Sequence, residues 1–412
     1  MSSPAAPPLD PARLMQGFPP PPPYRVHLGN WQQYPQKIWS FQHVQELFGT
    51  RSVPRSPQPR PWALAPDASG PNGFDALAVS PGMTWPQALT QTHVDASLVV
   101  HRGRIVDERW FNGMTPSSHH LLFSATKSMA GLMAEVQIAE GRLDPLGRVG
   151  TLLPELEASA WADATVRQVL DMTDGVMFTE DYADPSSDIF DYVAAVGWLP
   201  ERRASSQPPG ILDSLARLKK QHPETRGTAF RYRSPATDVT AWLAMRAADC
   251  SLSRWLAHHL WGPLGAEHDA HIMLDPLGTE VCFAGMSATA RDLARLGQCL
   301  LDQGRFAGHP VLPPSVVETL LRGGDPRAFA AGGYPEACPA RRGWSYRSQW
   351  WVRQTAPRLL SATGAFGQRL FVLPDDDMVV VLFSSHPSPL SSVIDPVHFS
   401  ALDALARHLR SP

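Results

Sequence analysis

The stretch Phe123-Ser-Ala-Thr-Lys-Ser-Met-Ala-Gly-Leu-Met-Ala-Glu-Val-Gln-Ile-Ala-Glu-Gly-Arg-Leu143 places a hydroxyl and an amine at the start of an apolar helical pattern. Ser124 and Lys127 stand three residues apart, and residues at this spacing share one face of a helix. The small and apolar residues that follow predict a mostly buried helix with Gly141 as its C-cap. Burial and the positive end of the helix dipole both favour the neutral amine of Lys127, which is the form that a general base requires.

Lysine is rare in this chain. Of its 36 basic residues only four are lysines, namely Lys37, Lys127, Lys219 and Lys220. An arginine keeps its proton in proteins, whereas a buried lysine can lose it. A lysine inside an apolar helix therefore indicates a titrating role for Lys127, and we interpret the other three as surface residues.

Composition and charge limit the function classes. The 412 residues are 43% apolar, enough for one large core or two joined cores. A formal charge of -3 without runs of like charge argues against nucleic acid and anionic membranes as partners. No apolar run reaches the roughly 18 residues that cross a bilayer. The N-terminus lacks the basic start and apolar centre of a secretory signal, so we expect a cytoplasmic protein.

Cysteine and histidine patterns give no sign of a metal or disulfide framework. The four cysteines lack Cys-x-x-Cys spacing and are interpreted as buried thiols in a reducing compartment: Cys250, Cys282, Cys299 and Cys338. The paired histidines are outside any His-Glu-x-x-His frame and are interpreted as solvated or capping residues: His119, His120, His258, His259, His268 and His271. No dinucleotide or P-loop motif is present, so we expect neither a metal nor another cofactor.

The ends of the chain differ from its middle. Residues 1–60 are rich in proline and aromatic residues, which predicts an extended arm packed on the body, with a short helix at about 40–48. Proline, serine and glycine at 51–73 indicate a linker. We expect an α/β sheet domain from residues 61–125 and 270–412, and a mostly helical domain from residues 126–269 that carries an active-site loop at 176–210.

Strand patterns occur near both ends and helix patterns in the middle. Strands are expected in a hairpin at 97–111 and at 349–354, 369–373 and 378–384. Helices are expected at 165–172, 211–221, 235–262, 288–303 and 396–410. This order predicts an α+β protein with one antiparallel sheet built from both ends of the chain and a helical domain inserted between them.

Two further segments carry candidate chemistry. Tyr232-Arg-Ser234 stands just before a predicted helix and offers a second proton-transfer group, although an ordinary half-buried aromatic explains the tyrosine equally well. Ala362-Thr-Gly-Ala-Phe-Gly-Gln368 is a glycine-punctuated strand edge, which lets a substrate carbonyl approach backbone N–H groups closely. The alternative for this segment is a plain β-turn.

The order Ser-x-x-Lys, Tyr-x-Ser, x-Thr-Gly resembles the serine β-lactamase and penicillin-recognising superfamily. Within it the chain is most similar, over nearly its whole length, to the 6-aminohexanoate-dimer hydrolases and their class C-like esterase relatives. Further matching segments are Asp181-Tyr182, Tyr232–Asp238, Gly285–Ala294, Gln349-Trp-Trp351 and Gly364–Gln368. The resemblance implies a β-lactamase and penicillin-binding-protein-like fold, in which helices flank an antiparallel sheet and an all-helical domain is inserted.

The resemblance also implies roles for individual residues. Ser124 would be the acylating nucleophile, Lys127 its base and Tyr232 the proton donor to the leaving group. The backbone N–H groups of Ser124 and Ala365 would form the oxyanion hole. Four residues would contact substrate, the first of them as a loop tyrosine that closes over it: Tyr182, Ser234, Thr363 and Gly364.

One departure from the superfamily pattern directs the functional prediction. Ala362 stands where β-lactamases and transpeptidases carry a lysine, so the cation that would bind a β-lactam carboxylate is missing. We therefore expect a serine hydrolase that forms an acyl-enzyme with small carboxylic esters or linear amides such as 6-aminohexanoate oligomers. The alternatives are a binding scaffold without catalysis and a true β-lactamase. A small-molecule substrate is the expected partner, and the oligomeric state stays open, with a homodimer as one candidate.

Overall fold

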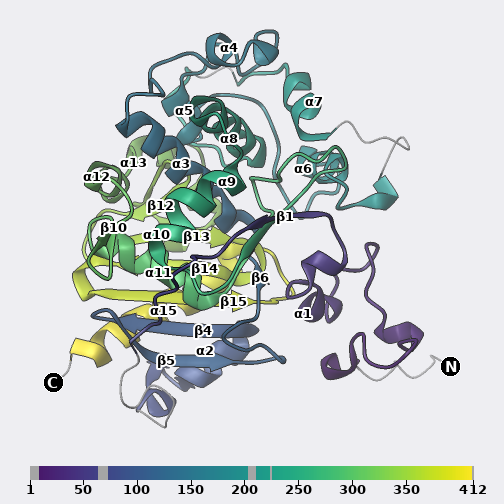
Figure 1. Ribbon diagram of the computed structural model, residues 1–412, viewed down its shortest axis with the longest axis vertical. Coiled ribbons are helices and arrows are strands. Elements are labelled where there is room, and N and C mark those ends of the chain that lie inside the picture. The colour runs from purple at the N-terminus through teal and green to yellow at the C-terminus, as the bar shows by residue number, and fades with distance from the viewer. Residues whose placement is uncertain (1–8, 64–72, 203–209, 223–224, 411–412) are drawn as a thin grey trace.

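The computed structural model describes residues 9–63, 73–202, 210–222 and 225–410. Its main feature is a seven-stranded antiparallel sheet with the strand order β11-β12-β13-β14-β15-β4-β5 (Figure 1). The strands are β4 (Val94–His101), β5 (Arg104–Trp110), β11 (Ser345–Arg347), β12 (Trp350–Arg353), β13 (Leu359–Gly364), β14 (Gln368–Leu373) and β15 (Met378–Ser384). The two ends of the chain meet where β15 pairs with β4, with Leu382 opposite Ser97. The predicted sheet built from both ends is confirmed.

Helices cover both faces of this sheet. On one face α11 (Ala290–Leu301) approaches so closely that a Cβ added to Gly297 would lie 2.5 Å from a methyl of Val379. On the other face α15 (Ser391–Arg410) supplies Asp395, whose carboxylate accepts from Arg369 at 2.8 Å. Because successive residues of a strand point to opposite faces, each strand contributes to both apolar layers.

A second sheet escaped prediction from the sequence. It has the order β1-β7-β8-β6, with β1 at Thr50–Val53, β7 at Ala270–Met273, β8 at Met286–Ala288 and β6 at His120–Leu121. These strands are two to four residues long, too short to show a period of two. β1 overlaps the start of the predicted linker at 51–73, of which residues 64–72 lie outside the described part of the chain. Two-residue to three-residue strands also form the small pairs β2 (Ala78–Ser80) with β3 (Met83–Thr84) and β9 (Arg305–Phe306) with β10 (His309–Pro310).

The helix that begins at Lys127 is the buried centre of the helical region. α3 spans Lys127–Ala139, and every residue from Lys127 to Gln137 is buried. Gly141 follows with φ +72°, as expected of a glycine at a C-cap. Figure 1 shows α4, α5, α7 and α8 gathered above the sheet, on the side away from β5. The helices between α3 and β7 are α4 (Val149–Leu152), α5 (Val166–Leu170), α6 (Asp188–Ala195), α7 (Gly210–Arg217), α8 (Ser234–Ala248), α9 (Leu252–Leu256) and α10 (Gly262–Leu264).

Several predicted helix bounds were wrong. The helix expected at 235–262 is interrupted, because α8 ends where Asp249 adopts a left-handed φ of +51°. The final helix begins at Ser391 rather than at Pro396, and the predicted loop at 176–210 contains α6, with residues 203–209 outside the described chain. The remaining helices are α2 (Trp85–Gln91), α12 (Pro314–Arg322), α13 (Pro326–Ala331) and α14 (Tyr334–Ala337).

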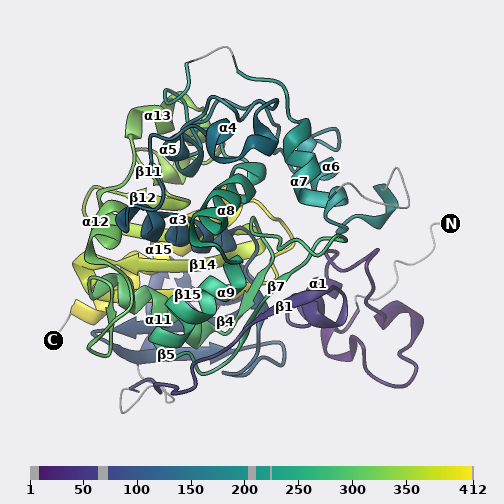
Figure 2. The ribbon, with the colours of Figure 1, turned by 45° about the horizontal axis from the view of Figure 1, so that its top comes forward.

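The N-terminal segment packs on the body through aromatic side chains. The helix expected at 40–48 was wrong: α1 spans Gln36–Ser40 and a 3-10 turn follows at Val44–Glu46. Trp31 is buried, and its Nε1 donates to the carbonyl of Trp198 at 3.2 Å. Figure 2 shows this segment in purple along one side of the molecule. The strand β1, which follows it in the chain, lies beside β7. In the described part of the chain, no helix has the length and apolar character that crossing a membrane requires.

Candidate active site

Ser124 sits in a strained turn just before α3. The 3-10 turn Phe123–Thr126 contains it, and Phe123 adopts a φ of +46°, which is uncommon for a residue other than glycine. Aromatic rings hold the Phe123 ring: its centroid lies 4.8 Å from that of Phe41 and 5.1 Å from that of Phe366. Residues in such backbone regions occur often at active sites. Here the strained turn leaves Ser124 half-buried at the edge of two cavities.

Lys127 makes contact with Ser124, as the sequence spacing predicted. Its Nζ donates to Ser124 Oγ at 3.1 Å, to Ser234 Oγ at 3.0 Å and to the carbonyl of Phe283 at 2.8 Å. These three acceptors match the three donors of an ammonium group. Burial lowers the pKa of Lys127 to about 8, although the negative charges of Glu180 and Asp238 act in the opposite direction. A substantial share of the amine is therefore neutral at mildly alkaline pH and can accept the Ser124 proton.

Glu180 belongs to this network and was missed by the sequence reasoning. Its Oε1 accepts from Ser234 Oγ at 2.9 Å and from the hydroxyl of Tyr182 at 2.9 Å, and its Oε2 accepts from the backbone N–H of Ser234 at 2.5 Å. Ser234, predicted to contact substrate, is fully buried and instead joins Lys127 to Glu180. Glu180 directly precedes Asp181-Tyr182, so its position beside a matched motif was the available signal.

Tyr232 is held as a protonated phenol beside Ser124. Its hydroxyl forms a hydrogen bond with Ser124, and burial, together with the charge of Glu180, raises the pKa of Tyr232 well above its ordinary value. Its ring stacks on Trp351 with centroids 5.4 Å apart and planes inclined by 24°. The Nζ of Lys127 lies 5.2 Å from the centroid of the same ring. Tyr232 therefore keeps its proton throughout the neutral pH range and can donate it beside Ser124.

Asp238 binds the backbone segment that Lys127 contacts. This buried carboxylate accepts from the backbone N–H groups of Cys282 at 3.1 Å and Phe283 at 3.2 Å, and from the Tyr192 hydroxyl at 2.6 Å. Burial raises the pKa of Asp238 to about 7. Because Asp238 fixes the backbone of Phe283, it also positions the Phe283 carbonyl that Lys127 contacts.

The strand edge at the end of β13 packs directly on the Ser124 turn. A Cβ added to Gly364 would lie 2.1 Å from the carbonyl oxygen of Leu122, so only glycine permits this approach. Ala365 follows at the cavity wall, and Phe366 has a φ of +61°. Positive φ values therefore flank both proposed oxyanion donors, at the residue before Ser124 and at the residue after Ala365.

Thr363 lines one of the two cavities beside Ser124, but its hydroxyl already has hydrogen-bond partners. Its Oγ1 accepts from Arg341 Nη2 at 3.1 Å and shares a hydrogen bond of 3.0 Å with Ser361. Arg341 in turn donates to Asp395 at 2.7 Å, and both of these side chains are fully buried. Arg341 therefore holds Thr363 and the end of β13 in place. Ala362, the residue at the position of the missing lysine, is also fully buried.

Two cavities meet at Ser124. A mainly apolar cavity of about 230 Å³ is lined by Phe123, Ile189, Phe190, Val193, Trp198, Leu199, Phe283 and Phe366 among others. A wider groove of about 600 Å³ contains Glu180, Tyr232 and Trp351. Ser124, Tyr182, Ala365 and Pro389 line both. The sequence-predicted residues Ser124, Lys127, Tyr182, Tyr232, Ser234, Thr363, Gly364 and Ala365 thus converge on one place.

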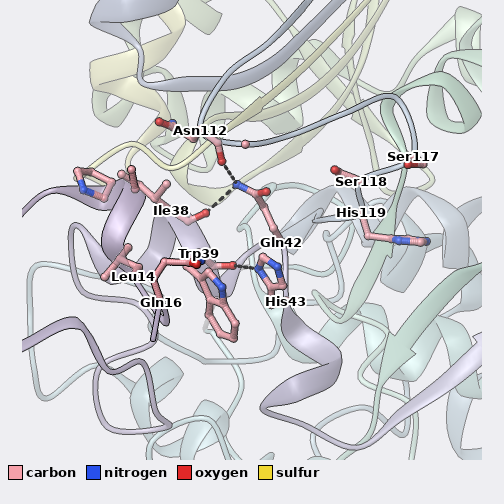
Figure 3. A pocket seen from close by; sticks show the side chains of 13 residues that line it. Leu14, Gln16, Ile38, Trp39, Gln42, His43, Asn112, Ser117, Ser118 and His119 are labelled. Carbon is pink, nitrogen blue, oxygen red and sulfur yellow. Dashed lines mark hydrogen bonds between the residues drawn. The ribbon is translucent and has the colours of Figure 1, made fainter. Parts of the chain in front are cut away.

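A separate cavity of about 590 Å³ lies between the N-terminal segment and the body (Figure 3). Gln42 crosses it and donates to the carbonyls of Ile38 and Asn112, while His43 bonds the carbonyl of Trp39 at 2.7 Å. None of the candidate catalytic residues lines this cavity.

Lys37 corrects one prediction. It was interpreted as a surface lysine, yet it is 2% exposed and lies in the wall of the apolar cavity beside Ser124. The helix α1 carries it inward, because the aromatic residues around it bury this part of the N-terminal segment. Lys219 and Lys220 are exposed as predicted.

Two histidines also differ from the prediction. His120 and His271 are buried rather than solvated, and His120 Nε2 lies 3.2 Å from Asp95 Oδ2. Burial lowers the pKa of His271 to about 3. Within the ranges that the structure covers, no group of three histidine, cysteine, aspartate or glutamate residues could hold a metal ion. All four cysteines are free, three of them buried and Cys250 partly exposed.

Comparisons with known proteins identify the family of this chain. The model of the β-lactamase family matches residues 87–401. The chain is 35% identical to the 6-aminohexanoate-dimer hydrolase of Paenarthrobacter ureafaciens over 364 residues, which cover 88% of each chain. It superposes with a TM-score of 0.82 on the structure of a presumptive 6-aminohexanoate-dimer hydrolase from Bacillus anthracis, at 27% identity over 93% of this chain and 97% of that one.

More distant structures share the fold. A family VIII carboxylesterase has a TM-score of 0.58 at 17% identity, and the match covers 84% of this chain and 99% of that one. The contact between Ser124 and Lys127, the sheet built from both chain ends and the match over most of the sequence lead to one assignment. The chain belongs to the β-lactamase family and is a hydrolase homologous to 6-aminohexanoate-dimer hydrolase.

Proposed function

We propose that this hydrolase cleaves small carboxylic esters and linear amides through an acyl-enzyme on Ser124. The observation that carries the proposal is the contact of 3.1 Å between Lys127 Nζ and Ser124 Oγ. Burial lowers the pKa of this lysine to about 8, so the amine can act as a base. A nucleophile within hydrogen-bond reach of an activating base is the arrangement that acyl transfer requires.

The residues divide the reaction between them. Lys127 takes the proton of Ser124 as its oxygen attacks the substrate carbonyl, and the N–H groups of Ser124 and Ala365 stabilise the resulting oxyanion. Tyr232 then gives its proton to the departing alcohol or amine as the C–O or C–N bond breaks, and the ammonium group of Lys127 passes the proton that it took from Ser124 to the Tyr232 oxygen. In the second half water attacks the acyl carbonyl and gives a proton to neutral Lys127, which passes it to Ser124 Oγ as the bond between that oxygen and the acyl carbon breaks and the carboxylic acid leaves.

The two cavities beside Ser124 would hold the two parts of the substrate. The leaving group would occupy the wide groove that contains Tyr232, and the acyl chain would occupy the apolar cavity. The similarity to a 6-aminohexanoate-dimer hydrolase supports linear amides as one substrate class. Tyr182 lines both cavities and lies on the loop before α6, where it would contact the bound substrate.

Hydrolysis of p-nitrophenyl acetate tests the proposal. The wild-type protein should release p-nitrophenol, and Ser124→Ala should abolish this turnover. Unchanged turnover by the variant would contradict the proposal. A parallel assay of the linear 6-aminohexanoate dimer and short esters would decide between amide and ester preference.

We also infer a small-molecule substrate and a cytoplasmic location, which the free thiols and the unbiased charge support. A homodimer stays a prediction, and analytical ultracentrifugation checks it.

A further inference from the structure

Lys37 is a buried cation, and none of the described residues gives it an acidic partner. Its Nζ donates to the carbonyls of His386 at 3.4 Å and Pro387 at 3.2 Å, and it lies 3.9 Å from the centroid of the Phe366 ring. The three contacts of this ammonium group are thus two carbonyl oxygens and the face of an aromatic ring, and none of them carries a full negative charge. Among the residues that the structure describes, no carboxylate forms an ion pair with Lys37.

The titratable groups around Lys37 do not compensate its charge. The imidazoles of His93 and His386 are its neighbours, and their ring centroids lie 5.2 Å apart. Asp95 is near His93 but is already engaged by His120, Asn112 and Ser385. Buried charges in proteins are normally paired, because an unpaired one loses its hydration without compensation. An unpaired cation in the wall of a cavity indicates that an anion binds there.

The position of the cavity determines which part of a substrate reaches Lys37. The cavity shares Ser124 and Ala365 with the wide groove, whereas Tyr232 lines only the groove. Since Tyr232 would protonate the leaving group, the leaving group lies on the groove side and the acyl chain enters the cavity of Lys37. Apolar side chains line the path between the two, as an aliphatic chain requires, and Gln32 adds a polar amide to the lining.

We propose that Lys37 binds a carboxylate at the far end of the acyl chain, so that the enzyme prefers monoesters or monoamides of aliphatic dicarboxylic acids. This inference rests on the proposed acyl-enzyme function of Ser124. Such a site would distinguish acyl chains by charge. An ammonium group at the far end would be repelled by the cation of Lys37, whereas a carboxylate would pair with it. Ala362 leaves β13 without a lysine, and Lys37 of the N-terminal segment would supply a cation in the cavity beside Ser124.

The test compares two esters that differ only at the far end. p-Nitrophenyl monoesters of dicarboxylic acids, graded from succinate to suberate, are compared with the same esters whose far carboxylate is methylated. The measured quantity is the ratio of kcat/KM for the acid to kcat/KM for its methyl ester. At neutral pH we expect at least one chain length to give a ratio of about ten or more, as for a hydrogen bond between charged groups.

Variants of Lys37 distinguish a role in binding the carboxylate from a role in packing the protein. Lys37→Met keeps an unbranched apolar side chain of similar length, and we expect it to lower the ratio by about tenfold or more. Lys37→Arg keeps the charge and should retain a preference for the acid. Lys220→Met makes the same substitution at an exposed site and should leave the ratio as in the wild type. A purely structural role of Lys37 would lower both kcat/KM values alike and leave their ratio unchanged.

The outcomes separate this inference from the function on which it rests. A wild-type ratio of one or less at every chain length overturns the carboxylate site even if Lys37→Met fails to fold. An unchanged ratio in a folded Lys37→Met protein overturns it as well. If neither ester is cleaved, or if Ser124→Ala cleaves both as fast as the wild type, the proposed function itself fails.

Discussion

Lys127 and Glu180 are joined through a single hydroxyl. Lys127 Nζ donates to Ser234 Oγ at 3.0 Å, and the same oxygen donates its proton to Glu180 Oε1 at 2.9 Å. The carboxylate of Glu180 is also the strongest of the charges that keep the pKa of Lys127 from falling further. Glu180 therefore holds the Ser234 hydroxyl in place, and its charge favours the protonated form of Lys127.

Glu180→Gln should shift the pH dependence of ester hydrolysis toward lower pH. Removing the negative charge removes an interaction that favours the protonated amine, so the pKa of Lys127 falls. The acidic limb of the kcat/KM profile should therefore move to lower pH. Glu157→Gln, at an exposed glutamate, is the matched control and should leave the limb in place. A shift to higher pH in Glu180→Gln would contradict this assignment.

The wild-type profile follows from the pKa of Lys127. Burial places this pKa at about 8, and the base must be neutral to accept the Ser124 proton. kcat/KM for a neutral ester should rise by about tenfold per pH unit below that value and level off above it. A stopped assay over a range of buffers at constant ionic strength measures the profile. A rate that falls as the pH approaches 8 would exclude Lys127 as the base.

Gly364→Ala should impair catalysis more than binding. The added Cβ would lie 2.1 Å from the carbonyl of Leu122, and relief of this clash must move the end of β13 and with it the N–H of Ala365. Loss of one oxyanion donor lowers kcat by about 10² to 10³-fold. Steady-state kinetics should show this loss mainly in kcat.

Gly49→Ala provides the control for that variant. No atom lies within 4 Å of a Cβ added at Gly49, so the same substitution is free of steric conflict there. Its kcat should equal that of the wild type. A Gly364→Ala protein with normal kcat would show that the approach of β13 to the Ser124 turn is not required.

Trp31→Ala should destabilise the protein. Trp31 is 2% exposed and its indole stacks parallel to the ring of Phe123, with centroids 6.3 Å apart. Truncation of a buried aromatic residue lowers the free energy of unfolding by about 3 to 5 kcal/mol. Phe18→Ala is the control in the same segment, since Phe18 is fully exposed and its removal should leave chemical denaturation curves unchanged. Equal curves for the two variants would contradict a packed N-terminal segment.

The parts of the fold that the sequence predicted are those with strong local patterns. The hairpin of β4 and β5, the strands β14 and β15 and the helix α3 are apolar runs of sufficient length, and distinct turn or capping residues bound them. The Ser124–Lys127 contact was predictable because spacing along one helical turn fixes it. The strand-edge position of Ala365 was likewise indicated by the glycines beside it.

The remaining features depend on contacts between distant parts of the chain. The short strands β1, β6 and β8 form by pairing within the sheet β1-β7-β8-β6, and they are too short to show an alternating apolar pattern in the sequence. Glu180 lies on a loop, and only the packing of that loop on α8 brings it to Ser234. Lys37 follows a proline-rich segment, where neither spacing nor propensity indicates burial. Such tertiary placements override local sequence signals.

Covalent labelling of Ser124 is the most direct test of the central claim. The intact protein is incubated with a fluorophosphonate probe, its mass is measured, and the modified peptide is located by fragmentation. The wild type should gain the mass of one phosphonyl group on Ser124, while Ser124→Ala should gain none. An unmodified wild-type protein, or a label that persists in Ser124→Ala, would contradict an acyl-enzyme mechanism at this serine.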